Sequence, residues 1–304
     1  MIPTINEEIM RSKCNFFVST QLWPLRNKLD PDGWLANFEL SDKKMALQLL
    51  NSFMYFSDDL LDRMFVSAVQ GLSRIVTTSH KSLSDRRVEW WQFLEDSIFT
   101  FPTGENPFAG DSGHLFVRRA RDLLQLDEEK ILDPKNALAE LCNGATKNII
   151  FVDDFVGTGQ QFFKTWNRLY SVGSRSISFE NLSSTYSFRA FYCPIFCTKY
   201  AIENQLNQLK DKVTFAPSHW LTQEHNLFSD DSIWWPNSMK SDAYDFVRNY
   251  SMQIGLPDTG GYDTRDWQAF HKLGLAISFR HCCPDATIPL FDTTEGGWCP
   301  LWKR

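Results

Sequence analysis

The residues with the clearest chemistry are two adjacent aspartates followed by a glycine turn. Asp153 and Asp154 come directly after the apolar run Ile149–Val152, and Gly157-Thr158-Gly159 precedes a helical stretch that begins at Gln160. The apolar run predicts a buried parallel strand, and ligands of open α/β sheets bind beyond the carboxyl ends of such strands. The N–H groups of the turn and of the helix N-terminus would form a cradle for an anion.

Carboxylates beside an anion cradle indicate a ligand with hydroxyl groups close to a phosphate. A ribose 5-phosphate fits, since its phosphate would lie in the turn while its 2′- and 3′-hydroxyls donate to Asp153 and Asp154. A P-loop ATPase would need Gly-x4-Gly-Lys-Ser/Thr, which the chain does not contain. A Rossmann site would need a third glycine where Phe162 stands, and a haloacid-dehalogenase phosphatase would need Asp-x-Asp. An acidic strand end with a glycine turn and no function stays open as the structural alternative.

The stretch Val152–Gly159 resembles the signature of type I phosphoribosyltransferases: apolar residues, two acids, two further apolar residues, a small residue, then Thr-Gly, any residue and Thr. The resemblance implies an α/β fold with a parallel sheet of phosphoribosyltransferase type, and it places Asp153 and Asp154 at the ribose hydroxyls. The residues that would surround the 5-phosphate are Phe155, Val156, Gly157, Thr158, Gly159, Gln160 and Gln161. Gln161 stands where the family has a threonine that contacts the phosphate, and its amide can also donate to a phosphate.

More of the chain resembles one branch of this family, the phosphoribosyltransferase-like proteins of bacterial conflict and antiphage-defence systems. The resemblance rests on Ile288–Leu290 with Trp298–Trp302, on Gly261–Asp263 before the run Leu273–Phe279, and on the long helical part that precedes Asp111–Gly113. It implies an effector that works with a protein partner, with a reverse transcriptase or a nucleic-acid component as an option. A non-catalytic nucleotide or sugar-phosphate sensor, or an interaction module in a defence complex, is the alternative.

If the site is catalytic, it would break the bond between C1′ of phosphoribosyl diphosphate and its leaving group. The carboxylates of Asp153 and Asp154 would stabilise an oxocarbenium-like transition state. Mg²⁺ would neutralise the diphosphate and would be held largely by ligand oxygens and water, so we assign no metal ligand to the protein. The acceptor stays open among a base, a nucleotide-derived compound and a macromolecule.

A second phosphate site is expected where Ser112 and Gly113 begin a helix after the strand-like run Ser97–Phe101. This strand, loop and helix would hold the diphosphate, and Arg118 and Arg119 follow on the same helix. The structural alternative, that Ser112 is only a helix N-cap, has equal weight.

The elements around these residues divide the chain into three expected regions. A helical N-terminal region (1–95) is followed by a phosphoribosyltransferase-like α/β core (96–220) and an irregular C-terminal cap packed on the core (221–304). Short apolar runs alternate with helical stretches in the core, which predicts a parallel sheet with helices on its faces. The expected core strands are Ser97–Phe101, Asn148–Val152, Phe188–Phe196 and Val213–Ala216, and the expected helices are Ser112–Leu124, Gln160–Tyr170 and Ala201–Leu209. In the N-terminal region, Ser41 and Ser57 are expected to cap helices.

Composition limits the partners and the compartment. The net charge of −6 argues against a broad nonspecific nucleic-acid surface, which would need cationic side chains. Seven scattered cysteines and no secretory start predict reduced thiols in the cytoplasm. No run approaches the roughly 20 apolar residues of a membrane span, so no membrane partner is expected.

Other clusters are expected to be structural. Cys193 and Cys197 share one face of a strand, which favours buried packing over a metal pair. A zinc site is disfavoured because the candidate ligands lack paired Cys-x2-Cys spacing; they are His281, Cys282, Cys283 and Cys299. Core or cap packing is expected for Trp234, Trp235, Trp298 and Trp302, with a base-stacking lid or a partner surface as the alternative.

Overall fold

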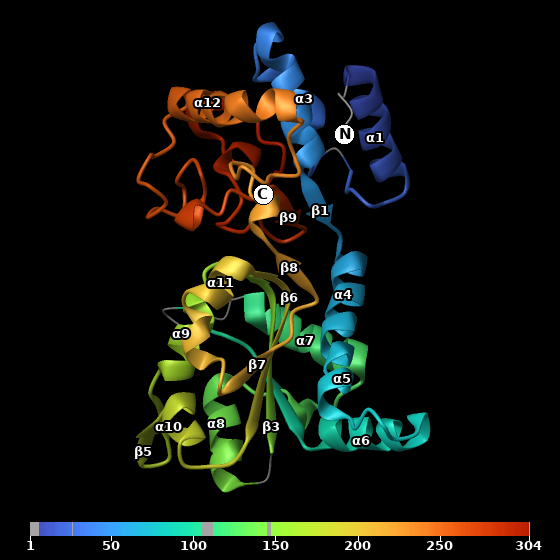
Figure 1. Ribbon diagram of the computed structural model, residues 1–304, viewed down its shortest axis with the longest axis vertical. Helices are drawn as coiled ribbons and strands as arrows, with labels where there is room; N and C mark the ends of the chain where they lie inside the picture. Colours follow the sequence, from blue (N-terminus) through green and yellow to red (C-terminus); the bar gives the residue numbers. More distant parts are fainter. Residues whose placement is uncertain (1–5, 26, 105–111, 145–146, 304) are drawn as a thin grey trace. The chain divides into compact units, whose positions relative to one another are not determined.

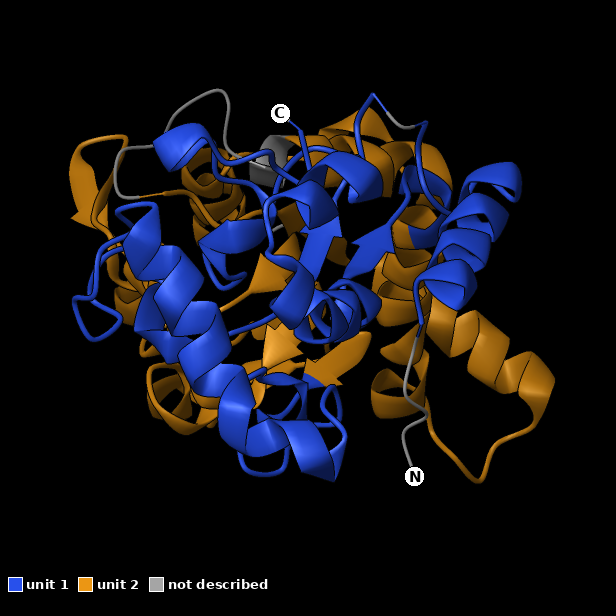
Figure 2. Ribbon diagram, turned by 90° about the horizontal axis from the view of Figure 1, so that it is seen from above, with its two compact units in different colours: residues 1–60, 221–304 blue, residues 61–220 orange. Residues whose placement is uncertain are grey.

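The computed structural model describes residues 6–25, 27–104, 112–144 and 147–303, which fall into two compact units (Figures 1 and 2). The first unit comprises residues 1–60 and 221–304, and the second comprises residues 61–220. The expected helical region 1–95 is therefore divided between the units: its first part joins the C-terminal segment, and residues 61–95 join the sheet. The physical reason is that the apolar side chains of 31–53 find their buried partners in the C-terminal segment.

The second unit is built on a parallel sheet, which confirms the predicted α/β class. Its strands are β2 (Ser97–Thr100), β3 (Asn148–Val156), β6 (Arg189–Thr198) and β7 (Val213–Phe215), in the order β2-β3-β6-β7. Every neighbouring pair in this order is parallel, and β8 (His219–Leu221) also pairs with β6. β3 lies between two strands and is buried almost throughout, as its near-continuous apolar run predicts.

Helices cover both faces of this sheet (Figure 1). One face packs in a single apolar cluster against α8 (Pro134–Asn143), α9 (Gln160–Asn167), α10 (Phe179–Ser183), α11 (Lys199–Glu203) and the 3-10 turn η3 (Leu206–Leu209). On the other face, Phe93 of α6 (Leu83–Glu95) meets Phe191 of β6, with ring centroids 5.3 Å apart. The remaining elements of this unit are α4 (Asp58–Gly71), which begins at the unit boundary, α5 (Ser73–Val76), α7 (Ser112–Leu124), η2 (Glu128–Lys130) and the hairpin β4 (Tyr170–Val172) with β5 (Arg175–Ile177).

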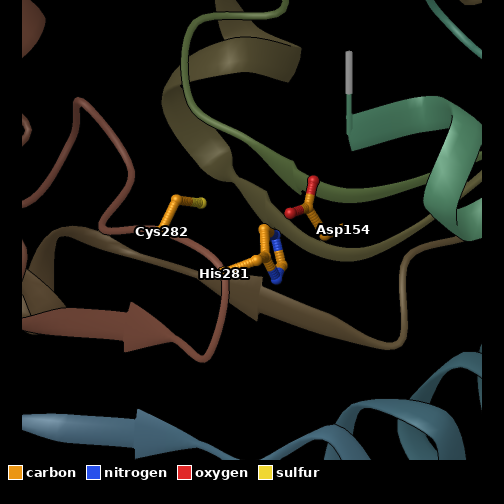
Figure 3. Close-up of side chains that lie close together, drawn as sticks. All are labelled: Asp154, His281 and Cys282. Atoms are coloured by element: carbon orange, nitrogen blue, oxygen red, sulfur yellow. The ribbon is translucent and has the colours of Figure 1, made fainter. Parts of the chain in front are cut away.

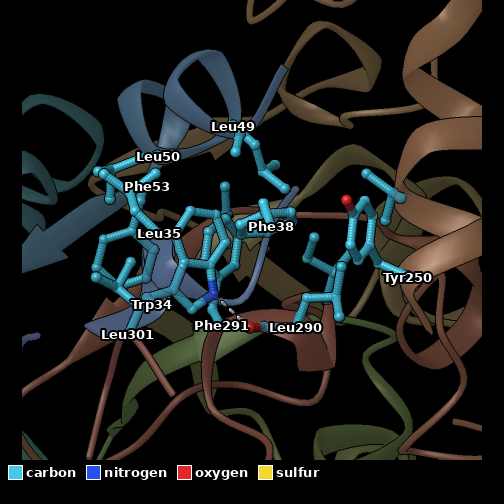
Figure 4. Packing of buried hydrophobic residues seen from close by; sticks show 14 of the residues in the cluster. Trp34, Leu35, Phe38, Leu49, Leu50, Phe53, Tyr250, Leu290, Phe291 and Leu301 are labelled. Carbon is cyan, nitrogen blue, oxygen red and sulfur yellow. Dashed lines mark hydrogen bonds between the residues drawn. The ribbon is translucent and has the colours of Figure 1, made fainter. Parts of the chain in front are cut away.

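The first unit joins the two ends of the chain around one aromatic core. Its helices are α1 (Glu7–Ser19), α2 (Pro31–Ala36), α3 (Lys43–Ser52) and α12 (Asn237–Gln253), and its 3-10 turns are η1 (Leu40–Asp42), η4 (Gln223–His225), η5 (Phe270–Lys272), η6 (Pro289–Phe291) and η7 (Glu295–Gly297). β1 (Met54–Phe56) pairs in parallel with β9 (Ile277–Phe279). In the core, the indole of Trp34 donates to the carbonyl of Leu290 at 2.7 Å (Figure 4).

The tryptophans near the C-terminus belong to this core. Trp235, Trp298 and Trp302 are buried, and Trp234 is half-buried. Each indole N–H donates to a backbone carbonyl: Trp234 to His225, Trp235 to Leu227, Trp298 to Leu290 and Trp302 to Phe279. Core packing, rather than a stacking lid, therefore accounts for these side chains.

Some local expectations need correction. The expected helical region 1–95 contains a strand, because the backbone of Met54 in β1 pairs with Ile277 of β9. Ser41 lies inside η1 rather than capping a helix. In the run Leu273–Phe279, only Ile277–Phe279 forms a strand. Ser57 does accept a hydrogen bond from the N–H of Leu60, at 3.4 Å. Within the described part of the chain, no helix has the length and apolarity that crossing a membrane would require.

Candidate functional site

Both aspartates lie within β3, near its carboxyl end. The strand runs on to Val156, so the acids are part of the ladder rather than following it. Asp153 pairs in register with Pro194 of β6. Asp153 and Asp154 are both buried, with only 3% and 5% of their surface exposed. Figure 3 shows the Asp154 carboxylate at this end of the strand.

Asp153 is held by bonds within the sheet. Tyr192 of β6 donates its hydroxyl to Asp153 Oδ2 at 2.8 Å, and the Asp154 N–H donates to Asp153 Oδ1 at 3.0 Å. Burial, together with the neighbouring Asp154 carboxylate, raises the pKa of Asp153 well above its ordinary value. Burial and the nearby Asp153 likewise raise the pKa of Tyr192. Asp153 and Tyr192 therefore lie in a low-dielectric environment that favours their neutral forms.

Asp154 points to the opposite face of the sheet, because successive side chains of a strand alternate. Its Oδ1 accepts a hydrogen bond from the Phe155 N–H at 2.9 Å. The two acids thus have different surroundings, and Asp154 lies two residues before the end of β3.

The turn after β3 has a shape that only glycine allows at one position. Gly159 has φ +79°, and a Cβ placed there would lie 2.6 Å from Leu206 Cγ. A side chain would therefore be strained by its backbone and blocked by η3. Thr198, at the end of β6, donates its hydroxyl to the Gly157 carbonyl and accepts from the Ala201 N–H at 3.0 Å, so one side chain both anchors the turn and caps α11.

The turn leaves backbone donors unused. Within the residues that the structure describes, the N–H groups of Gly157, Thr158, Gly159 and Gln161 donate no hydrogen bond, and the Gln160 N–H donates to Thr158 Oγ1 at 3.3 Å. These donors lie at the N-terminus of α9, where the helix dipole favours negative charge. The arrangement can hold a phosphate-sized anion.

The remaining predicted residues of the loop have distinct environments. Val156 is buried in the apolar cluster under α9, so only its backbone can face a ligand, and Phe155 is half-buried. The Gln161 side chain is exposed, and its amide donates to the Pro102 carbonyl at 3.4 Å instead of turning back over the cradle.

The second predicted phosphate site is described only in part. Ser112 and Gly113 are the first residues of α7, as expected, but their side chains and Asp111 lie outside the described residues. Arg119 forms an ion pair with Asp62 at 2.7 Å, and Arg118 is exposed. The guanidinium of Arg119 thus has a structural partner.

Sequence reasoning missed Tyr192, Thr198 and Arg168, which hold the acid, the turn and the loop after β2. Arg168 donates to Thr103 Oγ1 and to the Gly104 carbonyl. Tyr192 carried a weak signal, since a tyrosine within an apolar strand needs a partner for its hydroxyl. No sequence signal identified the other two partners, because the contacts join residues about 40 to 65 positions apart.

Three of the cysteines, Cys193, Cys197 and Cys299, and also His281, have surroundings that the structure describes within their own units. Cys193 and Cys197 are buried in β6, and burial raises the pKa of both thiols. His281 follows β9 and stacks on Phe279 with ring centroids 5.6 Å apart. Cys299 Sγ lies 3.9 Å from Asp30 Oδ2. Burial, together with the nearby Asp30 carboxylate, raises the pKa of the Cys299 thiol.

Comparison with known proteins adds one match. The family model PRTase-CE matches residues 31–304, which include the whole sheet unit and the Asp153–Gln161 segment. No curated protein and no solved structure matches the chain. The family match agrees with the parallel sheet, the buried acid pair and the glycine turn. The chain therefore belongs to the PRTase-CE family, a phosphoribosyltransferase-like family.

Proposed function

We propose that this phosphoribosyltransferase-like protein binds a ribose 5-phosphate-containing ligand, phosphoribosyl diphosphate or a nucleotide, at residues 153–161. The observation that carries the proposal is the set of unused N–H donors at Gly157, Thr158, Gly159 and Gln161, directly beyond a buried acid pair. An anion cradle alone would accept many phosphates, whereas carboxylates next to it select a phosphate that carries hydroxyl groups.

The two acids would have unequal roles. Asp153 already accepts two hydrogen bonds from the protein, so it would add a single contact to a ribose hydroxyl or position its neighbour. Asp154, two residues before the end of β3, would accept the principal hydroxyl bond. Mg²⁺ fits this donor set, because a carboxylate and diphosphate oxygens are the hard oxygen ligands it prefers. When bound, it would supply neutralisation of the diphosphate charge.

Calorimetry with purified protein tests the proposal. In the presence of Mg²⁺, ribose 5-phosphate and phosphoribosyl diphosphate should each show saturable binding. Asp154→Asn keeps the size of the side chain but loses its charge, and a charged hydrogen bond contributes about 1.5–3 kcal/mol. We therefore expect the Kd of both ligands to rise about tenfold or more.

The matched control is Asp127→Asn, which removes an exposed carboxylate of the same unit that makes no capping bond. It should leave both affinities unchanged. Undiminished affinity in Asp154→Asn, with the fold intact by circular dichroism, would contradict the assignment. Removing Mg²⁺ with EDTA should weaken the binding of phosphoribosyl diphosphate more than the binding of ribose 5-phosphate, because the diphosphate has the larger charge.

Such a site could serve in one of two ways, and the first is catalysis of phosphoribosyl transfer. The C1′–oxygen bond to diphosphate would break with its electron pair leaving on diphosphate, and a nucleophilic nitrogen of an acceptor would bond to C1′ and release its proton to solvent. The carboxylates nearby would favour the positive charge that develops on the sugar. Diphosphate release, measured with candidate bases, nucleotides and macromolecules as acceptors, tests this use.

The alternative is a sensor that binds the same ligand without turnover. It is favoured by one observation, the direction of the Gln161 amide toward Pro102, which leaves the cradle without a side-chain donor at the position of the family's threonine. Saturable binding with no diphosphate release for any acceptor would support the sensor.

The resemblance of the C-terminal part to defence proteins supports a biological setting for either use. We propose an effector role in bacterial antiphage defence, in the cytoplasm, within a complex that contains a protein partner and, as an option, a reverse transcriptase or nucleic-acid component. The net charge of −6 favours such an assembly over direct nonspecific DNA binding. Phage challenge of cells that express the gene with and without its neighbours tests this role. Protection by the gene alone would refute the need for a partner.

A further inference from the structure

Helix α6 of the sheet unit has large apolar side chains on two opposite faces. On its inner face, Phe93 and Leu94 are buried, with 4% and 8% of their surface exposed. On its outer face, Leu83, Val88 and Trp91 are 82%, 67% and 53% exposed. A surface helix usually has one apolar face, and apolar residues on both sides are typical of a helix that is covered on both sides. The described residues of the chain leave the outer face of α6 uncovered, at the edge of the sheet unit (Figure 1).

The outer face also has an ordered row of charges. Arg87, Trp91 and Glu95 follow each other at four-residue spacing and are all exposed. Residues four apart on a helix are neighbours, so the row presents a cation, an aromatic ring and an anion in that order. Its two charged residues are about 12 Å apart along the helix axis, which is too far for them to pair within one copy. Within the part of the chain that the structure describes, Arg87 forms no hydrogen bond or ion pair.

The anionic end of this row is held in place by Lys130. Its Nζ donates to Glu95 Oε2 at 2.8 Å and to the carbonyls of Leu94 and Glu95, both at 3.3 Å. Among the described residues, none donates to Glu95 Oε1, so this oxygen is open to a further donor. A carboxylate can accept hydrogen bonds at both of its oxygens. Glu95 is therefore positioned to accept a second cation from outside the chain.

A second copy of α6 in antiparallel orientation matches this row. A two-fold axis beside Trp91 reverses the order of the row, so that Arg87 of each copy lies opposite Glu95 of the other and the two Trp91 rings meet. The row is thus complementary to itself in charge and in apolar surface. A single-stranded nucleic acid would instead require several unpaired cations and stacking rings, and the Glu95 carboxylate would repel its phosphates.

We infer that the outer face of α6 is the interface of a homodimer, in which Arg87 and Glu95 pair between the two copies on either side of Trp91. The inference goes beyond the proposed function, because it concerns the assembly of the chain and not its ligand. α6 has 13 residues and is about 20 Å long. One helix face buries less than the roughly 800 Å² per partner of a standard interface. We therefore expect a Kd of about 10–100 μM, with the central tryptophan as its main anchor.

Sedimentation velocity tests the dimer and its apolar centre. The wild-type chain, at concentrations from about 1 to about 300 μM, should show a reversible equilibrium between monomer and dimer. Trp91→Ala should raise the Kd about thirtyfold or more, as expected for an aromatic residue at the centre of an interface. The matched control is Leu169→Ala, which shortens an exposed apolar side chain of the same unit outside α6 and should leave the Kd unchanged.

Charge reversal tests the antiparallel pairing. Arg87→Glu and Glu95→Arg each place like charges opposite one another at two symmetry-related positions, so each variant alone should dimerise about tenfold more weakly. An equal mixture of the two variants restores opposite charges at both positions. The mixture should therefore form a heterodimer with a Kd within about threefold of the wild-type value. Arg175→Glu, which makes the same charge change on β5, is the control and should have no effect.

Salt gives a readout that needs no variant. Because the ion pairs lie at an exposed edge, the wild-type dimer should weaken between about 0.05 and about 0.5 M NaCl. A wild-type chain that stays monomeric at about 300 μM would overturn the inference and leave this face to a different protein. A dimer that is insensitive to salt or to Trp91→Ala would also overturn it, as would folded charge variants that fail to associate when mixed. None of these outcomes bears on ligand binding at residues 153–161.

Discussion

Two buried aspartates, one in each unit, differ in the number of donors around them. Asp266 is fully buried in the first unit and accepts four bonds, from the N–H groups of Thr259, Gly261 and Gln268 and from the Thr259 hydroxyl. Burial by itself would raise its pKa, but these donors outweigh burial and lower it. Asp153, in the sheet unit, has two donors and a neighbouring carboxylate, and its pKa is raised.

The comparison shows that the donors, rather than burial, decide which charge state a buried carboxyl group favours. The Asp266 carboxylate has all its acceptor positions filled by protein donors, as expected for a side chain that stabilises the fold. Asp153 retains acceptor capacity beside a turn with unused N–H groups, and a perturbed carboxyl group in such a place is typical of a functional site.

Residues 269–272, which follow Asp266, have a strained backbone, and the hydrogen bonds of the Asp266 carboxylate help to hold it. Ala269, His271 and Lys272 have φ values of 69°, 53° and 57°, a region that L-residues rarely adopt. Such residues persist only where surrounding contacts hold them. The His271 N–H donates to the Gly261 carbonyl at 2.8 Å, so the Asp266-organised loop is bonded directly to this strained segment.

The largest effect is expected from removing the saturated carboxylate. Asp266→Ala leaves three backbone N–H groups and one hydroxyl without an acceptor, and each buried unsatisfied donor costs about 1–3 kcal/mol. We expect the unfolding free energy to fall by about 3 kcal/mol or more in urea titrations. Asp263→Ala, which removes an exposed carboxylate with a single backbone bond, is the control and should cost about 1 kcal/mol or less. If Asp266→Ala and Asp263→Ala lowered the unfolding free energy equally, the hydrogen bonds of Asp266 would have no special role in stability.

A smaller effect of the opposite sign is expected at Asp153. Its raised pKa means that the folded state holds a proton which the unfolded state releases, so stability falls as pH rises from the ordinary Asp pKa of about 4 to the raised value. Asp153→Asn keeps the size of the side chain and removes this titration. At pH 8 the variant should be more stable by about 1 kcal/mol or more, since a pKa that differs by one between the folded and unfolded states corresponds to about 1.4 kcal/mol.

Thermal melts of both proteins between pH 4 and pH 8 check this sign. The difference should shrink toward pH 4, where both proteins are uncharged at this position. For Asp266 the sign is reversed, because its lowered pKa gives stability that is present above the ordinary pKa and is lost as pH falls. An identical pH dependence of wild type and Asp153→Asn would show that Asp153 is charged like Asp266.

The smallest effect is expected at Gln161. Threonine would restore the hydroxyl donor of the family pattern and would lose the bond to Pro102. For a sensor, Gln161→Thr should tighten ribose 5-phosphate binding by up to about tenfold, the value of one added hydrogen bond. For an enzyme adapted to a special substrate, it should instead lower product release. Calorimetry and product release, measured side by side, separate these outcomes, and equal behaviour would mean that Gln161 does not touch the ligand.

The sheet unit was predictable because its signals are local. The apolar run before Asp153 and the Gly-x-Gly turn each arise within a few residues, and strands alternating with helices predict a parallel sheet. The end of β3 was placed too early, because ladder bonds to β6 carry the strand through both acids to Val156. Backbone pairing at polar residues such as Asp153 and Asp154 leaves no apolar pattern in the sequence from which the strand could be extended.

The first unit was far less predictable. β1 and β9 are more than 200 residues apart, and three-residue strands carry too little periodicity to be recognised. The bond from Trp34 to the Leu290 carbonyl joins the same distant segments. Residues 1–60 therefore lacked any sequence signal that they would share a core with 221–304 rather than with the adjacent helices.

By itself the sequence determined the family, the α/β class and the residues at which a sugar phosphate is expected, since adjacent acids and a glycine turn depend on neighbouring residues alone. Only the tertiary structure decided that Tyr192 holds Asp153, that Thr198 anchors the turn and that Gln161 and Arg168 reach the loop after β2. These contacts arise when packing brings distant segments within hydrogen-bond distance. The same packing removes water, and it is the loss of water that raises the pKa of one aspartate while a full set of donors lowers that of the other.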